Sequence, residues 1–213
     1  HMGYIKRTPL TEYRLQNRGG VGAKGSTTRE EDFIEHIYVA NMHSTMMFFT
    51  KNGKCYWLKV YDVPEGSKAS KGRAIQNVIN IEPDDAVQAY MNVENLDDSD
   101  YINNHYVVLA TRKGTIKKTS LEAYSRPRAN GIIAINVRED DSLIEALLTD
   151  GEKDILLAGR KGRCCRFHES TVRAMGRTAA GVRGIRIDDD DEVVGMICVN
   201  GSNEAESQEH ILV

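Results

Sequence analysis

The chain contains no apolar run of the roughly 20 residues that a membrane-spanning helix requires, and its start does not resemble a signal peptide. Cysteine is scarce, and Cys55, Cys164, Cys165 and Cys198 do not form the spaced framework of a disulfide-rich domain. These absences argue against a membrane protein and a disulfide-stapled secreted fold. We expect a soluble cytoplasmic protein with reduced thiols and no membrane contact.

A large net charge is also missing, because 28 Lys and Arg face 31 Asp and Glu for a formal net charge of −3. Composition alone would therefore argue against a polyanionic partner. The distribution of charge reverses that inference. Residues 3–24, 51–73, 112–128 and 160–186 hold 25 of the 28 basic residues but only five acidic ones.

A repeat of about 50 residues underlies this segregation. Four pairs of glycines bracket the basic segments: Gly3 and Gly22, Gly53 and Gly72, Gly114 and Gly131, and Gly162 and Gly181. An acidic cluster follows each pair, at residues 31–32, 84–85, 140–141 and 188–191, and we expect these clusters at the opposite end of each repeat from the basic loops. A period of this length indicates a propeller or a similar array.

The repeat predicts an all-β fold, because each complete unit shows four short strand-like segments separated by turn residues. In the second unit these segments are 33–40, 45–49, 54–60 and 75–81. The predicted units span about 3–32, 33–85, 86–141, 142–191 and 192–213 of a single domain. The first and last units are complementary halves, so the chain is expected to form a partial ring that either closes or stays an open arc.

The glycines of each pair are expected to differ in role. The first lies in a turn between two strand-like runs, where a positive φ suits a hairpin. The second opens the last strand of the unit, where a bulge or a close approach of two backbones is expected.

Catalytic chemistry is not predicted. The tyrosines and histidines lie in strand or loop contexts without a neighbouring nucleophile–base pair or a ligand spacing. Four consecutive acidic residues, Asp188 to Asp191, could in principle bind a divalent metal. Such a run in a turn is more often a solvated acidic surface, so we expect no metal site.

The first basic loop differs from the other three. Following Gly3-Tyr-Ile-Lys-Arg-Thr-Pro-Leu10, it contains Gln16-Asn17-Arg18-Gly19-Gly20-Val21-Gly22. This segment resembles the gyrase A box, the seven-residue signature of the C-terminal DNA-wrapping domain of DNA gyrase A. Gln16, Arg18, Gly19, Gly20 and Gly22 match the signature, whereas Asn17 and Val21 replace residues that are usually basic. Elsewhere, the segments 114–119, 170–176 and 181–186 also look like that domain.

The resemblance implies a propeller-like disc of four-stranded blades called a β-pinwheel, of which this chain would be the amino-terminal part. It also implies a role: wrapping double-stranded DNA around a basic rim, without base reading, so that an ATP-dependent type II topoisomerase can introduce negative supercoils. The cleaving tyrosine, the ATPase site and their ATP and Mg²⁺ would lie outside this chain, which would need no cofactor. The implied partners are DNA, the remainder of gyrase A and the gyrase B protein, at the bacterial nucleoid.

Phosphate contacts are expected from the basic loops and from the box, whose glycines would let backbone N–H groups approach phosphates. The predicted DNA-binding residues are Lys6, Arg7, Arg14, Gln16, Arg18, Gly19, Gly20, Gly22, Lys24, Lys54, Lys59, Lys68, Lys71, Arg73, Arg112, Lys113, Lys117, Lys118, Arg126, Arg128, Arg163, Arg166, Arg173, Arg177 and Arg183.

Two alternatives stay open from the sequence. The corresponding C-terminal domain of topoisomerase IV shares the repeat, but its box is degraded or absent, and the nearly complete box here favours gyrase. A β-propeller that binds protein or carbohydrate partners would explain the repeat, but it would not require the basic residues to be sorted into equivalent loops.

Overall fold

The computed structural model describes residues 2–22, 25–26 and 32–200, and these form a β-rich chain of short antiparallel strands. The strands are β1 (Tyr4–Ile5), β2 (Thr45–Thr50), β3 (Lys54–Lys59), β4 (Arg73–Ala74), β5 (Val87–Val93), β6 (Tyr106–Thr111), β7 (Thr115–Ser120), β8 (Ile132–Ile133), β9 (Leu143–Thr149), β10 (Lys153–Gly159), β11 (Cys164–His168), β12 (Val182–Arg183) and β13 (Val193–Asn200). The helical elements are α1 (Ser99–Asn104) and the 3-10 turns η1 (Leu10–Glu12), η2 (Val60–Asp62), η3 (Ile75–Asn77), η4 (Leu121–Tyr124) and η5 (Glu169–Thr171).

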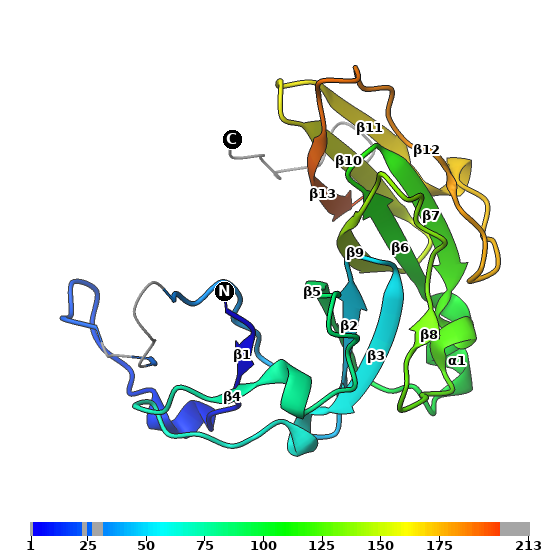
Figure 1. Cartoon of the computed structure of the whole chain (residues 1–213). Coiled ribbons are helices and arrows are strands. Elements are labelled where there is room, and N and C mark those ends of the chain that lie inside the picture. The colour runs from blue at the N-terminus through cyan, green and yellow to red at the C-terminus, as the bar shows by residue number, and fades with distance from the viewer. Residues whose placement is uncertain (1, 23–24, 27–31, 201–213) are drawn as a thin grey trace.

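The strands form four sheets, with the orders β1-β4, β5-β2-β3-β8, β12-β7-β6-β9 and β11-β10-β13. All the pairings within them are antiparallel, which confirms the all-β prediction. Figure 1 shows the sheets following one another along an arc, with β5, β9 and β13 on its concave side and β8 and β12 on its convex side. In the part of the chain that the structure describes, the arc is open.

The sheets do not coincide with the repeat units. The two central strands of the second sheet, β2 and β3, come from unit 33–85, whereas β5 and β8 at its two edges come from unit 86–141. The third sheet is built the same way, with β9 and β12 supplied by the following unit. The basic segments at 51–73, 112–128 and 160–186 therefore each start in one sheet and lead to the outer edge strand of the preceding sheet.

Both faces of the second sheet are covered by neighbouring parts of the chain. On β2, Met47 and Phe49 belong to the cluster shared with the third sheet, whereas Met46 and Phe48 belong to the cluster shared with Ile75. All six residues of β2 are buried as a result. This sandwiching suppresses the polar and apolar alternation that a half-exposed strand would show.

Two predicted strands of the second unit are wrong. Residues 33–40 have no regular structure, although the equivalent β5 and β9 pair with β2 and β6. Among the described residues, no strand lies beside residues 33–40 as β2 lies beside β5. Residues 33–40 therefore lack backbone hydrogen-bond partners for a strand. The predicted strand 75–81 begins instead with the 3-10 turn η3, and the two-residue strand β4 lies just before it.

The last strand of each unit is short because the chain bends around a hairpin turn. After β8, the N–H groups of Ala134 and Ile135 both donate to the carbonyl oxygen of Gly53, at 2.8 and 3.2 Å. After β12, Gly184 and Ile185 donate to Gly114 in the same way, at 2.9 and 3.3 Å. The predicted segments 132–137 and 182–187 thus contain only two strand residues each.

The glycine predictions are confirmed in part. The first glycine of each pair has the expected positive φ. The close backbone approach expected at the second is found at Gly72, Gly131 and Gly181 and not at Gly22, and Gly53 and Gly114 show it as well. All eight paired glycines have positive φ, between +69° and +89°. Gly181 in addition approaches the neighbouring backbone closely, because a Cβ there would lie 2.6 Å from the carbonyl oxygen of Ile116. Gly162 has φ +85° and nothing within 4 Å of its virtual Cβ.

This difference predicts unequal costs for two alanine substitutions. Gly162→Ala should cost about 1 kcal/mol, since only the left-handed conformation opposes it. Gly181→Ala should cost about 2–4 kcal/mol, because the strained conformation and the contact with Ile116 add together. Urea unfolding of both variants measures the difference, and equal destabilisation would contradict a close approach at Gly181.

Candidate nucleic-acid interface

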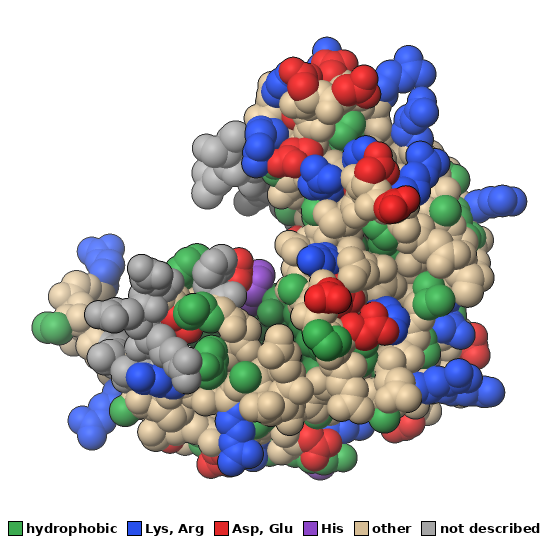
Figure 2. Space-filling view, viewed as in Figure 1, with side chains coloured by type: hydrophobic (Ala, Val, Ile, Leu, Met, Phe, Trp, Pro, Cys, Tyr) green, Lys and Arg blue, Asp and Glu red, His purple; other side chains and the backbone are tan. Residues whose placement is uncertain are grey.

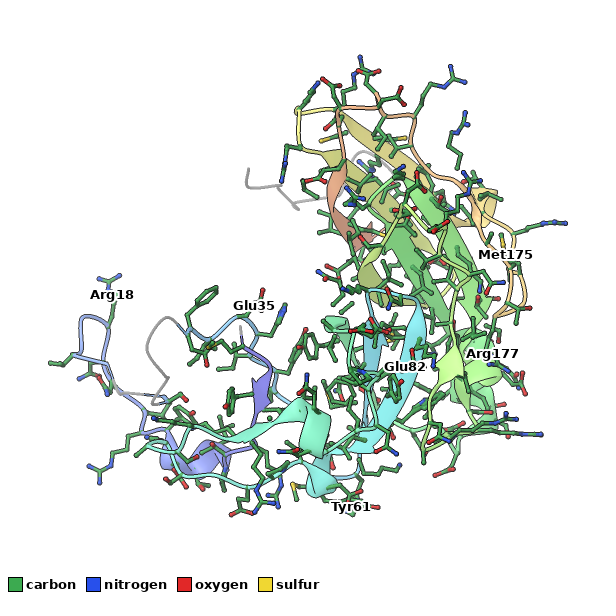
Figure 3. The ribbon with its side chains drawn as sticks, viewed as in Figure 1. Arg18, Glu35, Tyr61, Glu82, Met175 and Arg177 are labelled. Carbon is green, nitrogen blue, oxygen red and sulfur yellow. The ribbon has the colours of Figure 1, made fainter. Side chains whose placement is uncertain are left out.

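The basic segments reach the outer edge of the arc through three crossings, residues 60–72, 121–131 and 169–181, which we call the crossing segments. Each joins the third strand of one sheet to the edge strand of the preceding sheet. Figure 2 shows lysine and arginine side chains projecting from the convex side of the arc. In Figure 3, Met175 and Arg177 mark the last crossing segment on that side.

The acidic clusters do not lie away from the basic loops, so that prediction is wrong. The last aspartate of each cluster accepts hydrogen bonds from backbone N–H groups of a basic hairpin turn. Asp85 accepts from Asn52 at 3.2 Å, Asp141 from Lys113 at 2.9 Å, and Asp191 from Lys161 at 3.1 Å. The first unit repeats the arrangement, because Asp32 accepts from Met2 and Phe33 at 3.0 Å each.

These clusters also neutralise cations at the hairpins. Lys113 contacts Asp140 and thereby lowers the pKa of that carboxyl group. The last cluster also pairs with Lys161 through Asp190 and with Arg163 through Asp188. Acidic residues outside the clusters form the remaining pairs: Glu192 with Arg112 and Arg160, Asp154 with Arg166, and Glu82 with Lys54. The predicted phosphate contacts at Lys54, Arg112, Lys113, Arg163 and Arg166 stay predictions: these side chains are partly exposed, but each already forms an ion pair that DNA would have to replace.

Two other predicted contacts point into the fold. Lys117 is fully buried, and Lys118 is 6% exposed. Lys118 forms a 2.8 Å ion pair with the buried Glu169, and its ammonium group lies 4.3 Å from the centre of the Tyr106 ring. A DNA phosphate cannot reach a buried ammonium group, so both predicted contacts are wrong.

The first unit holds an equivalent pair, which is likewise engaged. Lys6 donates to four backbone carbonyl oxygens, and Arg7 pairs with Glu65 at 2.7 Å while its Nε donates to Val63 at 2.8 Å. Neither side chain is the freely exposed cation that we predicted.

A second group of cations is exposed and forms no ion pair with any described residue. It contains the predicted Arg14, Arg18, Lys71, Arg73, Arg126, Arg128, Arg173 and Arg183, together with Lys51, Arg138 and Arg186, which the sequence argument did not select. Arg138 lies beside the acidic cluster 140–141 and outside the four basic segments, so the charge pattern of the sequence did not mark it as a DNA-binding residue. The exposed arginines Arg126, Arg128 and Arg173 lie on crossing segments, and Arg183 follows one.

Three predicted DNA-binding residues are neither fully exposed nor in an ion pair, and a fourth lies outside the described residues. Lys59 donates to His43 at 3.4 Å, Lys68 lies 4.6 Å from the centre of the Tyr13 ring, and Arg177 donates to Ile133 at 3.5 Å. All three are half-buried with their charge unpaired among described residues. Lys24 is not among the described residues.

The box loop, residues 16–22, projects from the end of the arc, with Arg18 near its tip in Figure 3. Its shape is set internally, because Gln16 Oε1 accepts from the Gly22 N–H at 3.0 Å and the Gly20 N–H donates to Asn17 at 2.9 Å. These two N–H groups are occupied, so the prediction that Gly20 and Gly22 offer them to phosphates is wrong for this conformation. Gly19 and Gly22 supply positive φ, and Arg18 is exposed.

Other kinds of site find little support in the described part of the chain. No group of three or more His, Cys, Asp or Glu side chains there is arranged to hold a metal ion. None of the helices among those residues has the length and apolarity to cross a membrane. Burial raises the pKa of the Cys55 thiol well above its usual value.

The fold and this surface define a class: a propeller-like repeat protein whose exposed, unpaired cations follow the outer edge of its sheets. The family model of the DNA gyrase C-terminal domain, beta-propeller, matches residues 3–41, 44–93, 105–150 and 153–200. The chain belongs to this family, which confirms the resemblance and the propeller-type fold. DNA gyrase is a type II topoisomerase.

Individual relatives of known name support the assignment to this family. The chain is 44% identical over 201 residues to the DNA gyrase A protein of Salmonella typhimurium, covering 94% of the chain and 22% of the relative. It is 44% identical over 209 residues to that of Haemophilus influenzae, covering 95% of the chain and 23% of the relative. The chain thus spans less than a quarter of these relatives.

Solved structures support the fold. The C-terminal domain of DNA topoisomerase IV aligns with a TM-score of 0.75 at 27% identity, covering 93% of this chain and 59% of that one. A DNA gyrase A C-terminal domain aligns with a TM-score of 0.67 at 21% identity, covering 93% of this chain and 62% of that one. At that identity the second match supports the fold alone.

Proposed function

We propose that the chain binds double-stranded DNA through its phosphates and wraps it along the outer edge of the arc, without reading base sequence. The observation that carries the proposal is the recurrence of exposed, unpaired arginines on or beside successive crossing segments. Phosphate neutralisation along a curved path needs such a series, and it needs no groove-reading helix.

The energetics favour many contacts over a few strong ones. DNA is stiff over about 150 base pairs, and bending a 20–30 base-pair site costs about 1–6 kcal/mol. Eleven exposed cations without an ion pair among the described residues can offset that cost as a series. The acidic hairpins beside them repel DNA and help to confine it to one track.

In the larger protein, the proposed role is geometric and not catalytic. The chain would hold wrapped DNA for an ATP-dependent gyrase made of the rest of gyrase A and of gyrase B, enabling negative supercoiling at the bacterial nucleoid. ATP and Mg²⁺ would be used elsewhere in that assembly. The similarity to gyrase A proteins over 94% of the chain supports this assignment. The structural likeness to a topoisomerase IV domain keeps that enzyme as the second candidate.

A gel-shift titration of the chain with unrelated duplexes at several salt concentrations tests the binding half of the proposal. We expect similar affinities for all duplexes and a log K that falls linearly with log salt, with a slope of about −5 for about six phosphate contacts. Binding that does not depend on salt, or no binding at low salt, would instead favour a propeller that binds proteins or carbohydrates.

A further inference from the structure

One repeat position, three residues after the hairpin glycine, carries a lysine in two units. Lys117 follows Gly114, and its Nζ donates to the backbone carbonyl oxygens of Ala134, at 2.5 Å, and Arg177. The side chain has no exposed surface. Burial, with a contribution from Arg177, lowers the pKa of Lys117 to about 8, so the group is still an ammonium ion at neutral pH.

Lys6 occupies the same position after Gly3 and makes the same kind of contact. Its Nζ donates to Ser67 at 2.9 Å, Ser70 at 3.1 Å, Lys68 at 3.2 Å and Gly25 at 3.3 Å. Burial lowers the pKa of Lys6, and the charge of Glu12 opposes that shift. In both units, one ammonium ion therefore binds backbone carbonyl oxygens of a crossing segment of the following unit, three such oxygens for Lys6 and one for Lys117.

The crossing segments 60–72 and 169–181 correspond residue by residue, and the comparison is clearest over their last ten residues. Residues 63–72 and 172–181 each begin with a buried valine and end in a glycine of positive φ, 79° at Gly72 and 89° at Gly181. Between these ends no side chain is fully buried, and Met175 is the one apolar residue there that packs partly against a core cluster, so apolar packing fixes little of either path. The carbonyl oxygen of Arg177 in the second segment is the counterpart of that of Lys68 in the first.

The neighbouring residue on each strand strengthens the attachment. The Met175 N–H donates to the Lys118 carbonyl oxygen at 2.9 Å, and the Gly66 N–H donates to the Arg7 carbonyl oxygen at 3.0 Å. The other two hairpins lack this lysine-to-carbonyl contact, because Tyr56 and Cys165 occupy the position that Lys6 and Lys117 hold in their repeats. The lysine contact thus distinguishes two crossings from the third, residues 121–131.

We propose that Lys6 and Lys117 are positioning residues for DNA binding: each ammonium ion fixes the backbone of a crossing segment and so fixes the cations that the segment presents, without touching DNA. For Lys117 these cations are Arg173, Arg177 and Arg183, and for Lys6 they are Lys68, Lys71 and Arg73. The inference rests on the proposed DNA-binding function and assigns these two lysines an indirect role in it.

A double-mutant cycle on DNA affinity tests the role of Lys117. K117M alone should weaken binding about tenfold near 0.1 M salt and reduce the salt slope, because displaced arginines contact fewer phosphates. In a background with Arg173, Arg177 and Arg183 replaced by alanine, K117M should cause no further loss, since the groups that it positions are gone. K6M in that background should keep its full effect, because its own crossing segment is intact.

Three outcomes are decisive. If the unmodified chain does not bind DNA, the proposed function fails. If it binds, but the K117M loss persists undiminished in the triple-alanine background, the positioning role is overturned.

Should K117M not fold, K6M with Lys68, Lys71 and Arg73 replaced by alanine provides the same cycle at a half-buried site, and K6R should restore affinity. Without DNA, hydrogen exchange in K6M should rise over residues 63–72 and stay unchanged over 121–131, and unchanged exchange at 63–72 would also overturn the role.

Discussion

Replacing Arg126, Arg128, Arg173 and Arg183 together by alanine is expected to lower the affinity of the chain for DNA about 10³-fold at 0.1 M salt. The same variant should show a salt slope shallower by about 3 to 4, since each phosphate contact contributes about 0.9. All four side chains are exposed and have no ion pair with any described residue. Gel shifts at four or more salt concentrations measure both quantities.

These arginines are expected to dominate binding because they form no ion pair with any described residue before DNA binds. An exposed, unpaired guanidinium releases condensed counterions from DNA without first breaking an existing interaction. A cation in an ion pair must give up its carboxylate, and that carboxylate then repels the DNA. We therefore expect the outer-edge arginines to carry a larger share of the free energy of DNA binding than their number among all basic residues suggests.

A control variant removes the same amount of charge from the hairpins. Arg112, Lys113, Arg160 and Lys161 all contact Asp140, Asp190 or Glu192. Replacing these four by alanine changes the net charge equally, but should change the affinity less than about tenfold. Equal losses in the two variants would mean that net charge, and not the outer edge, governs binding.

The sequence predicted the repeat, the turn glycines and most strands correctly, because these follow from short-range patterns. The orientation of the basic residues could not be read in that way. Lys117 and Lys118 are adjacent on β7, so one of them would face solvent in a strand with one exposed face. Here neighbouring sheets cover both faces of β7, and both side chains are buried.

The partners of the charged groups were also invisible in the sequence. Asp141 binds a hairpin 28 residues earlier in the chain, and Glu169 binds Lys118 across 51 residues. Spacing within one unit cannot reveal such contacts, because each sheet combines strands from two units. The same exchange explains residues 33–40: their pattern is that of a strand, but a strand forms only where a neighbour offers a ladder.

The box loop has a different design, since its shape is fixed by its own residues. A Cβ at Gly20 would lie 2.6 Å from Gln16 Oε1, and Gly19 and Gly22 have φ of +86° and +80°. Alanines at these positions cannot form the loop without strain. Val21 is fully exposed, at 105% of its reference area, and its side chain takes no part in the loop's hydrogen bonds.

In the assembled enzyme, replacing Gln16 to Gly22 with alanines is expected to abolish negative supercoiling while ATP-dependent relaxation continues. The loop would lose both its shape and Arg18, so we expect this end of the arc no longer to hold DNA, whereas the proposed strand passage would take place elsewhere in the assembly. Plasmid supercoiling and relaxation assays on the reconstituted enzyme measure the two activities separately. V21A is the matched control and should supercoil normally, while R18A and Q16A separate lost charge from lost shape. Retained supercoiling in the seven-alanine variant would refute the role of the box, and loss of both activities would point instead to failed assembly.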